Sequence, residues 1–366
     1  MAPSATEPAR ATTAIHPGKV AGTKPWVKNT GSLDQDEHIE VTPVIGREYP
    51  HVNLVSLLQA PNSEELLREL ALTISQRGVV FFRAQDNLTA DLQKELIQRI
   101  GLASGKPSTS GLHIHPILNS EREGYRVTDP EISTIDSELN KKIYKDAGKL
   151  SIATQSKKQN SGQWHSDIAF EPVPADYSSL RLVNLPKTGG DTLWASGYEI
   201  YDRISAPYQK FLEGLTTTFS QPGFIEAAER GGFTIYDKPR GAPENVGREL
   251  TAVHPVVRTN PVTGWKSIFP VGGHISHIND ITELESKALL RWFSRLLVDN
   301  HDLQVRFKWK NPNDIAIWDN RSTFHTATYD IEDQGERYGV RTVSIGEKPF
   351  FDPESKSRRE ALAAKA

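Results

Sequence analysis

Hydrophobic residues between positions 60 and 101 recur every three to four residues in two stretches, which is typical of amphipathic helices. The first predicted helix begins at Asn62, an N-cap residue followed three positions later by an acidic residue, and ends at Gly78. The second begins at Thr89 and ends at Gly101. Between them, the apolar run VVFFR at 79–83 predicts a short buried strand.

From residue 162 onward, short apolar or alternating runs bounded by turn residues predict strands. One clear helix interrupts them at 283–297, and its apolar side carries Leu284 and Phe293. Many short strands with few helices favour a barrel or sandwich over alternating parallel β/α units. The sequence therefore predicts a mainly β fold with flanking helices, with strands at 162–170, 176–185, 191–195, 251–258, 266–270, 303–309, 314–318 and 337–346.

Composition along the chain predicts where the folded part begins and ends. Residues 1–45 open with sequence rich in Ala, Thr and Pro and are predicted to be a disordered leader. Residues 46–352 contain no convincing linker or repeat and are predicted to form a single domain, followed by a C-terminal tail at 353–366. Within the domain, residues 222–249 are rich in Gly and Pro and predict either a lid or a disordered surface loop.

Overall composition narrows the possible partners and chemistry. The formal net charge of -3 and the absence of a long basic block predict a small substrate and no nucleic acid. No stretch reaches the roughly 18 apolar residues of a membrane span, and no secretion signal opens the chain, so we expect no membrane partner and a cytoplasmic location. The chain has no cysteine, which leaves His, Asp and Glu as metal ligands.

The segment GQWHSDIAF at 162–170 places two ionisable residues in a predicted strand. Side chains alternate along a strand, so His165 and Asp167 share one face. They form either a hydrogen-bonded pair or two ligands of a metal. Non-haem iron(II) oxygenases bind iron through two histidines and one carboxylate, and the best second histidine is His325, whose alternative is a surface residue after a turn.

Two arginines follow in the predicted strand at 337–346. Arg337 and Arg341 are four positions apart and share a face with Val343 and Ile345. Arginine pairs with carboxylates through two parallel hydrogen bonds, so inward-facing arginines among apolar residues require anionic partners. The alternative is a pair of solvated arginines, which would leave Val343 and Ile345 exposed as well.

Four segments in order resemble one known family: His165-x-Asp167, GGDTLWAS at 189–196, WDNRSTFH at 318–325, and the two arginines. Together they resemble the taurine dioxygenase and 2,4-dichlorophenoxyacetate dioxygenase family of Fe(II)- and 2-oxoglutarate-dependent enzymes, over roughly residues 45–350. The resemblance implies a double-stranded β-helix, also called a jelly roll or cupin-like fold, and the cofactors Fe(II), 2-oxoglutarate and O₂. It also implies roles for individual residues, with His165, Asp167 and His325 as iron ligands and Thr192 and Arg337 binding the distal carboxylate of 2-oxoglutarate.

The same resemblance implies a substrate site. His115 and Arg341 match the residues that contact the anionic group in taurine dioxygenase, whereas Leu118 and Ser161 stand where that enzyme has a tyrosine and an asparagine. Two polar contacts to taurine are thus absent. Val343 and Ile345 form either an apolar pocket wall or ordinary core. We expect a small anionic organic substrate with an apolar body, such as an alkylsulfonate, a sulfate ester, or a carboxylate such as an aliphatic amino acid.

The implied reaction is oxidation of an unactivated C–H bond with release of succinate and CO₂. A sulfonate or sulfate ester would give an aldehyde and sulfite or sulfate, whereas an amino acid would be hydroxylated, desaturated or cyclised. Asp167 argues against halogenation, because halogenating relatives lack this carboxylate. The alternative is a non-catalytic jelly-roll binding protein with a structural ion. The resemblance also implies a homo-oligomer, either a dimer or a tetramer.

Overall fold

The computed structural model describes residues 27–119, 126, 128–139 and 163–364. Its largest sheet has seven strands in the spatial order β1-β2-β3-β13-β5-β15-β4. Neighbouring strands run antiparallel, except for the parallel pair β2 and β3. The strands are β1 (Ile39–Glu40), β2 (Arg47–Tyr49), β3 (Val79–Phe82), β13 (Ile315–Asp319), β5 (Ala175–Asn184), β15 (Tyr338–Ile345) and β4 (Ser133–Asp136).

Three smaller sheets complete the β structure. One has the order β12-β6-β14, formed by Gln304–Phe307, Thr192–Ser196 and Thr323–Ala327. A second has the order β11-β7-β8, formed by Ile275–Ile278, Thr216–Ser220 and Thr251–Pro255, and a third pairs β9 (Val257–Thr259) with β10 (Lys266–Ile268). Thus β6 and β14, which carry Thr192 and His325, are neighbours in one sheet.

An aromatic cluster joins the large sheet to the sheet of β6, β12 and β14. Phe81 of β3 stacks on Phe307 of β12 at a centroid distance of 4.1 Å and lies edge-on to Trp194 of β6. Trp194 in turn meets Trp318 of β13 at 5.7 Å. These buried rings fix the distance between the two layers, because a packed interior deforms little.

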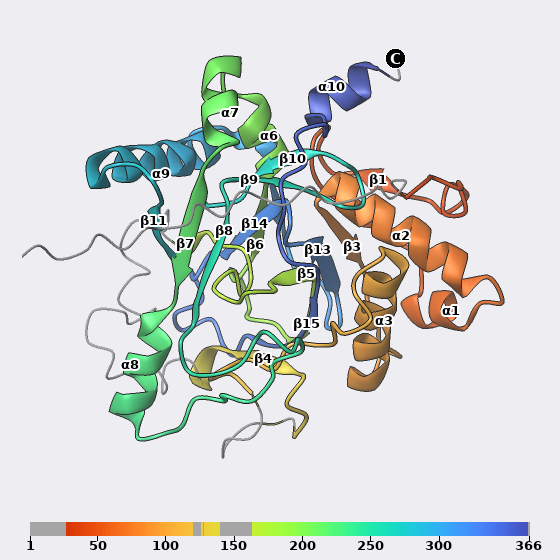
Figure 1. Ribbon diagram of the computed structural model, residues 1–366. Coiled ribbons are helices and arrows are strands. Elements are labelled where there is room, and N and C mark those ends of the chain that lie inside the picture. Colours follow the sequence, from red (N-terminus) through yellow and green to blue (C-terminus); the bar gives the residue numbers. More distant parts are fainter. Residues whose placement is uncertain (1–26, 120–125, 127, 140–162, 365–366) are drawn as a thin grey trace, which may run out of the picture.

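Helices pack against the outside of the β layers. The helices α1 (Leu54–Gln59), α2 (Ser63–Arg77) and α3 (Ala90–Ala103) cover one side of the large sheet (Figure 1). Further helices are α6 (Gly197–Asp202), α7 (Ala206–Leu212), α8 (Pro222–Gly231), α9 (Glu283–Val298), the 3₁₀ helix η2 (His301–Leu303) and α10 (Arg358–Ala363). In the described residues, no helix is long and apolar enough to cross a membrane.

Several predicted elements are confirmed. α2 runs from the N-cap Asn62 to Gly78, and β3 is buried throughout. α3 begins after Thr89, whose side chain accepts the backbone N–H of Leu92, but continues beyond Gly101 to Ala103. The helix predicted at 283–297 is also present, yet Leu284 is 80% exposed, so its assignment to the apolar side is wrong.

The strand predicted at 162–170 is wrong. Among its described residues, only His165 makes a β-bridge, and 167–170 form a turn. Ile168 has φ +48°, a left-handed backbone conformation that a regular strand does not contain. Alternation of polar and apolar residues fits a short bridge followed by a turn as well as it fits a strand.

The predicted leader ends earlier than residue 45. Residues 1–26 lie outside the described residues, but β1 pairs with β2, and Leu33 and Ile45 are buried. The tail predicted at 353–366 includes α10, and Arg358 at its start forms an ion pair with Glu199. Both ends of the folded part therefore extend beyond 46–352.

Residues 222–249 are not a disordered loop. They begin with α8 and continue as an ordered loop held by Arg240, which is fully buried. The Arg240 guanidinium forms a two-pronged ion pair with Glu171 and donates to the carbonyls of Tyr236 and Gly247. Glu171 also bonds His113, so one buried carboxylate ties this segment to two others.

Candidate metal and cosubstrate site

His165, Asp167 and His325 come together although the last two are 158 positions apart in the chain. His325 lies in β14, and the backbone of His165 pairs with it through two N–H···O=C bonds of 3.1 and 2.9 Å. Both histidine Nε2 atoms lie 3.9 Å from Asp167 Oδ1. One donor atom from each of the three residues lies within 4.8 Å of the others, so they could hold one metal ion.

The protonation states suit a metal ion. Burial lowers the pKa of His165 and lowers that of His325 to about 3, so both rings are neutral near pH 7. His165 Nδ1 lies 2.8 Å from the carbonyl of Gln163, which accepts its N–H and leaves the Nε2 lone pair toward Asp167. Neutral imidazoles and a carboxylate are the donor set that divalent iron binds.

Asp167 is a buried carboxylate with two different oxygen environments. Burial raises the pKa of its carboxyl, but the Arg341 guanidinium, the two histidines and the Ser178 hydroxyl together outweigh burial and hold the pKa below its usual range. Oδ1 accepts Arg341 Nη1 at 2.7 Å and faces both histidines, whereas Oδ2 accepts the Ser178 hydroxyl at 2.8 Å. The carboxylate therefore stays ionised and presents Oδ1 to the histidines.

Arg337 lies just before β15 and has no carboxylate partner among the described residues. Its Nε donates to the Gly190 carbonyl at 2.9 Å and its Nη2 to Thr192 Oγ1 at 3.3 Å. Burial lowers the pKa of Arg337 to about 10. A buried cation with neutral partners is costly, which makes this position a site for an anion.

The Thr192 hydroxyl has a free hydrogen for such an anion. Its oxygen accepts N–H groups from Arg337 and from Trp309 Nε1 at 3.2 Å. Both partners are donors only, so the hydroxyl hydrogen points elsewhere. Thr192 and Arg337 could therefore donate to the same carboxylate.

His115, predicted for the substrate side, lies in a buried region near Arg341. His115 Nδ1 accepts the backbone N–H groups of Ile117 and Leu118 at 3.2 and 3.0 Å, which assigns the ring proton to Nε2. Its ring lies 5.2 Å from that of Phe224 in α8. Burial lowers the pKa of His115 well below its ordinary value, and the positive charge of Arg341 lowers it further.

The apolar candidates are packed into the interior. Leu118 contacts a cluster with Ile117, Ala228 and Ile235. Val343 and Ile345 belong to another cluster that includes residues after Asp167, namely Ile168, Phe170, Val173 and Ala175 together with Ala242 and Leu250. Ser161 lies outside the described residues.

Sequence patterns did not reveal His274, which lies beside the site. Its ring is 5.8 Å from that of His165 and 5.2 Å from that of Phe170. The sequence feature that could have indicated it is the pair of glycines directly before it, Gly272 and Gly273. Gly272 has φ +83° and its Cα lies so close to Trp164 that a Cβ would be 1.6 Å from the Trp164 carbonyl oxygen.

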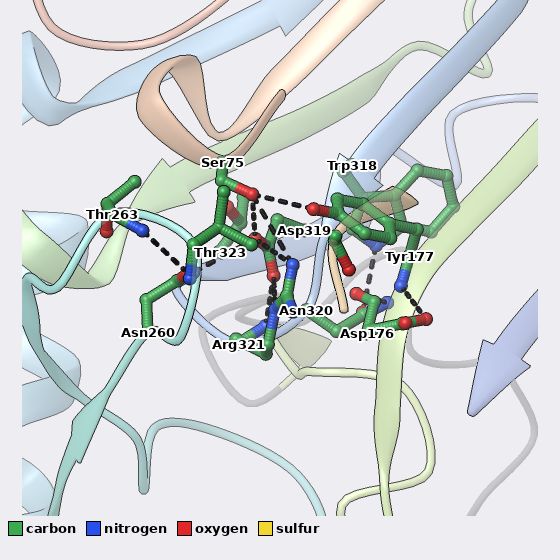
Figure 2. A network of polar contacts seen from close by, with 12 residues as sticks. Ser75, Asp176, Tyr177, Asn260, Thr263, Trp318, Asp319, Asn320, Arg321 and Thr323 are labelled. Carbon is green, nitrogen blue, oxygen red and sulfur yellow. Dashed lines mark hydrogen bonds and ion pairs between the residues drawn. The ribbon is translucent and has the colours of Figure 1, made fainter. Parts of the chain in front are cut away.

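The turn between β13 and β14 forms a second buried network (Figure 2). The Asp319 carboxylate accepts Arg321 Nε and Nη2, both at 2.8 Å, together with Ser75 Oγ at 2.7 Å and Asn260 Nδ2 at 2.9 Å. All four residues are buried. This network explains the residues before the histidine in WDNRSTFH, since it fixes the start of the strand that carries His325.

Comparisons with known proteins agree with this geometry. Residues 37–343 match the family model "Taurine catabolism dioxygenase TauD, TfdA family". The chain is 51% identical to the alpha-ketoglutarate-dependent dioxygenase btcD of Neocamarosporium betae, over 92% of this chain and 98% of that protein. It is 32% identical to an alpha-ketoglutarate-dependent sulfonate dioxygenase of Saccharomyces cerevisiae, over 89% and 70% of the two chains.

A solved structure leads to the same assignment. A taurine dioxygenase from Burkholderia xenovorans is 25% identical and superimposes with a TM-score of 0.61, covering 90% of this chain and 98% of the other. Alpha-ketoglutarate is another name for 2-oxoglutarate. The protein belongs to the TauD/TfdA family and is an Fe(II)- and 2-oxoglutarate-dependent dioxygenase, whose cofactors are Fe(II), 2-oxoglutarate and O₂.

Proposed function

We propose that this dioxygenase oxidises an unactivated C–H bond of a small anionic organic substrate, with an alkylsulfonate or a sulfate ester as the first candidate. His165, Asp167 and His325 bind the iron, and Thr192 and Arg337 bind the distal carboxylate of 2-oxoglutarate. The observation that carries the proposal is Arg337, a buried cation whose bonds go to neutral oxygens at Gly190 and Thr192. An anionic cosubstrate would supply its missing counter-charge.

Bound Fe(II) with 2-oxoglutarate and O₂ supplies the oxidant and yields succinate and CO₂. The chain's own residues orient the reactants. Asp167 presents one oxygen beside the two neutral histidines, while Arg337 and Thr192, which are hydrogen-bonded to each other, would hold the distal carboxylate of 2-oxoglutarate. The proposed fold that brings these residues together is a double-stranded β-helix, supported by the two β layers around the site.

The substrate anion is proposed to bind His115 and Arg341. The Nε2–H of His115 remains available as a donor, because Nδ1 is occupied by two backbone N–H groups. Arg341 keeps a buried Nε–H without a partner among the described residues. A buried donor without an acceptor costs about 1–3 kcal/mol, which an anionic group would recover.

An apolar substrate body is supported by Leu118, whose side chain adds no polar group near His115 and packs in an apolar cluster. Val343 and Ile345 pack with other apolar residues, and their contribution to a pocket wall stays a prediction, as does that of Ser161. An aliphatic amino acid or another carboxylate offers the same anion and apolar body. It is the second candidate, with hydroxylation, desaturation or cyclisation as the outcome.

A succinate-release screen tests the proposal and separates the candidates. The enzyme with Fe(II), 2-oxoglutarate and ascorbate is offered alkylsulfonates, sulfate esters, aryloxyacetates and aliphatic amino acids. We expect the fastest release of succinate with a sulfonate or sulfate ester, and sulfite or sulfate as the second product. Succinate release only with amino acids would overturn the first candidate. The expected homo-oligomer, cytoplasmic location and lid role of 222–249 stay predictions.

A further inference from the structure

The carboxylate of Asp167 ends a chain of hydrogen bonds whose direction is fixed at its other end. Trp318 Nε1 donates to Asn320 Oδ1 at 2.9 Å, and an indole N–H cannot accept. The backbone N–H of Asp167 donates to the same oxygen at 3.2 Å. Two obligate donors therefore identify this atom as the amide oxygen of Asn320, and the amide nitrogen must point the other way. Figure 2 shows Trp318 and Asn320 beside the Asp319 network.

The hydrogen bonds keep the same donor-to-acceptor direction from Asn320 through Ser178 to the Asp167 carboxylate. Asn320 Nδ2 donates to Ser178 Oγ at 2.8 Å, so the Ser178 hydroxyl gives its own hydrogen to Asp167 Oδ2, also at 2.8 Å. Ser178 is fully buried, and Trp318 and Asn320 are nearly so. Water does not compete with these bonds, which makes their geometry rigid.

We propose that Ser178 and Asn320 are positioning residues that restrict Asp167 to binding metal through Oδ1 alone. The Ser178 hydroxyl holds Oδ2 and so fixes the orientation of the carboxylate, in which Oδ1, although it also accepts Arg341 Nη1, is the oxygen that faces both histidines. Oδ1 remains beside the two histidine Nε2 atoms, and a coordination position on the ion stays open for other ligands. This inference rests on the proposed metal site of His165, Asp167 and His325.

Two adjacent serines of β5 provide the test and its matched control. Ser178 and Ser179 are both fully buried, and each makes a side-chain hydrogen bond. Ser179 faces the opposite side of the strand, where its hydroxyl accepts Gln93 Nε2 at 3.0 Å. Ser178→Ala and Ser179→Ala thus remove the same group at the same depth, but only the first touches Asp167.

Mn(II) binding without cosubstrate, followed by the electron paramagnetic resonance signal of free Mn(II), measures the effect separately from activity. We expect Ser178→Ala to raise the Kd for Mn(II) by about 10- to 100-fold, the usual range for losing a partner of a metal ligand, and Ser179→Ala to leave it within about twofold. Equal Kd values for Ser178→Ala and the wild type, or equal weakening in both variants, would overturn the inference.

Asn320→Asp gives a second route if Ser178→Ala does not fold. A carboxylate at this position accepts the Ser178 hydroxyl and removes the donor from Asp167 Oδ2, so the Kd should again rise at least tenfold; an unchanged Kd contradicts the inference. Wild-type protein that binds Mn(II) no better than the His165→Ala variant would instead contradict the metal site itself. The two failures are therefore distinguishable.

Discussion

Arg337 and Arg341 lie at one end of β15 and within it, and both are buried, but their partners differ. Arg341 already bonds a carboxylate, that of Asp167. Arg337 bonds only a backbone carbonyl and a hydroxyl, and burial lowers its pKa. The comparison shows that a pair of like residues on one segment can contain one satisfied cation and one that awaits an anion.

The difference predicts separate ligands for the two arginines. An anion beside Arg337 replaces neutral partners and relieves an uncompensated buried charge, so the gain is large. An anion beside Arg341 shares a guanidinium that Asp167 has partly neutralised, so the gain is smaller. Each arginine can be tested against both the cosubstrate and the prime substrate.

The largest effect is expected from Arg337→Ala. Removing the cation should raise the Kd for 2-oxoglutarate by about 100-fold or more, because a buried charge-assisted pair is worth about 2–5 kcal/mol. The measurement is anaerobic titration of the Fe(II)–2-oxoglutarate visible absorbance band. Arg337→Lys keeps the charge without the planar guanidinium, so its Kd for 2-oxoglutarate should lie between those of the wild type and Arg337→Ala. A wild-type Kd in Arg337→Ala would assign the cosubstrate to another cation.

A smaller effect is expected from Arg341→Gln. It should raise the KM for the best substrate of the succinate screen by about tenfold, consistent with one bond to a charged group, and leave the Kd for 2-oxoglutarate within about twofold. Steady-state kinetics and the same anaerobic titration give the two values. A rise in the Kd for 2-oxoglutarate with an unchanged substrate KM would mean that the two arginines have exchanged roles.

Acid should weaken the segment around Asp167 through His254. His254 Nε2 lies 3.0 and 3.1 Å from the carbonyls of Ala169 and Glu171, and burial lowers its pKa to about 3. The unfolded chain binds a proton near pH 6.5 whereas the folded chain does not. The free energy of unfolding therefore falls as the pH drops from about 6.5 toward 3, by about 1.4 kcal/mol per pH unit for this histidine.

His254→Gln isolates that contribution, because glutamine keeps an N–H donor and does not titrate. The free energy of unfolding is measured with urea at pH 6.5, 5.5 and 4.5. Its slope against pH should be shallower in the variant than in the wild type by about one proton, or about 1.4 kcal/mol per pH unit. Identical slopes would show that His254 does not couple acid to stability.

The smallest effect is expected from Thr192→Val, which keeps the shape but removes the hydroxyl. The Kd for 2-oxoglutarate should rise about fivefold, since one hydrogen bond from an uncharged donor contributes about 1 kcal/mol. The same anaerobic titration measures it. A loss as large as that of Arg337→Ala would mean that Thr192 acts mainly by holding Arg337, through the 3.3 Å bond between them.

Local periodicity predicted the helices well, and motif order predicted which residues meet. α2 and α9 have apolar faces, α9 begins with a capping box at Thr282, and His165, Asp167 and His325 lie together as the motifs indicated. The strand at 162–170 failed because alternation does not report the left-handed backbone of Ile168. Leu284 failed because an apolar residue in the first turn of a helix can lie beyond the neighbouring surface.

Other features depend on partners that no local pattern specifies. The ion pair of Glu171 with Arg240 joins residues 69 positions apart, and the bond from Gln93 to Ser179 spans 86. Ser178 and Ser179 are adjacent and identical, yet only the first faces Asp167. Such assignments require the three-dimensional register of the strands.

Gly272 shows how far the demands of the site extend beyond its ligands. A side chain there would collide with the carbonyl oxygen of Trp164, the residue before His165, and φ +83° adds strain to any larger residue. In a saturation-mutagenesis library selected for dioxygenase activity, position 272 should tolerate as little variation as position 165. Gly272 contributes no atom to the metal site, yet such a library would show it to be as intolerant of substitution as an iron ligand.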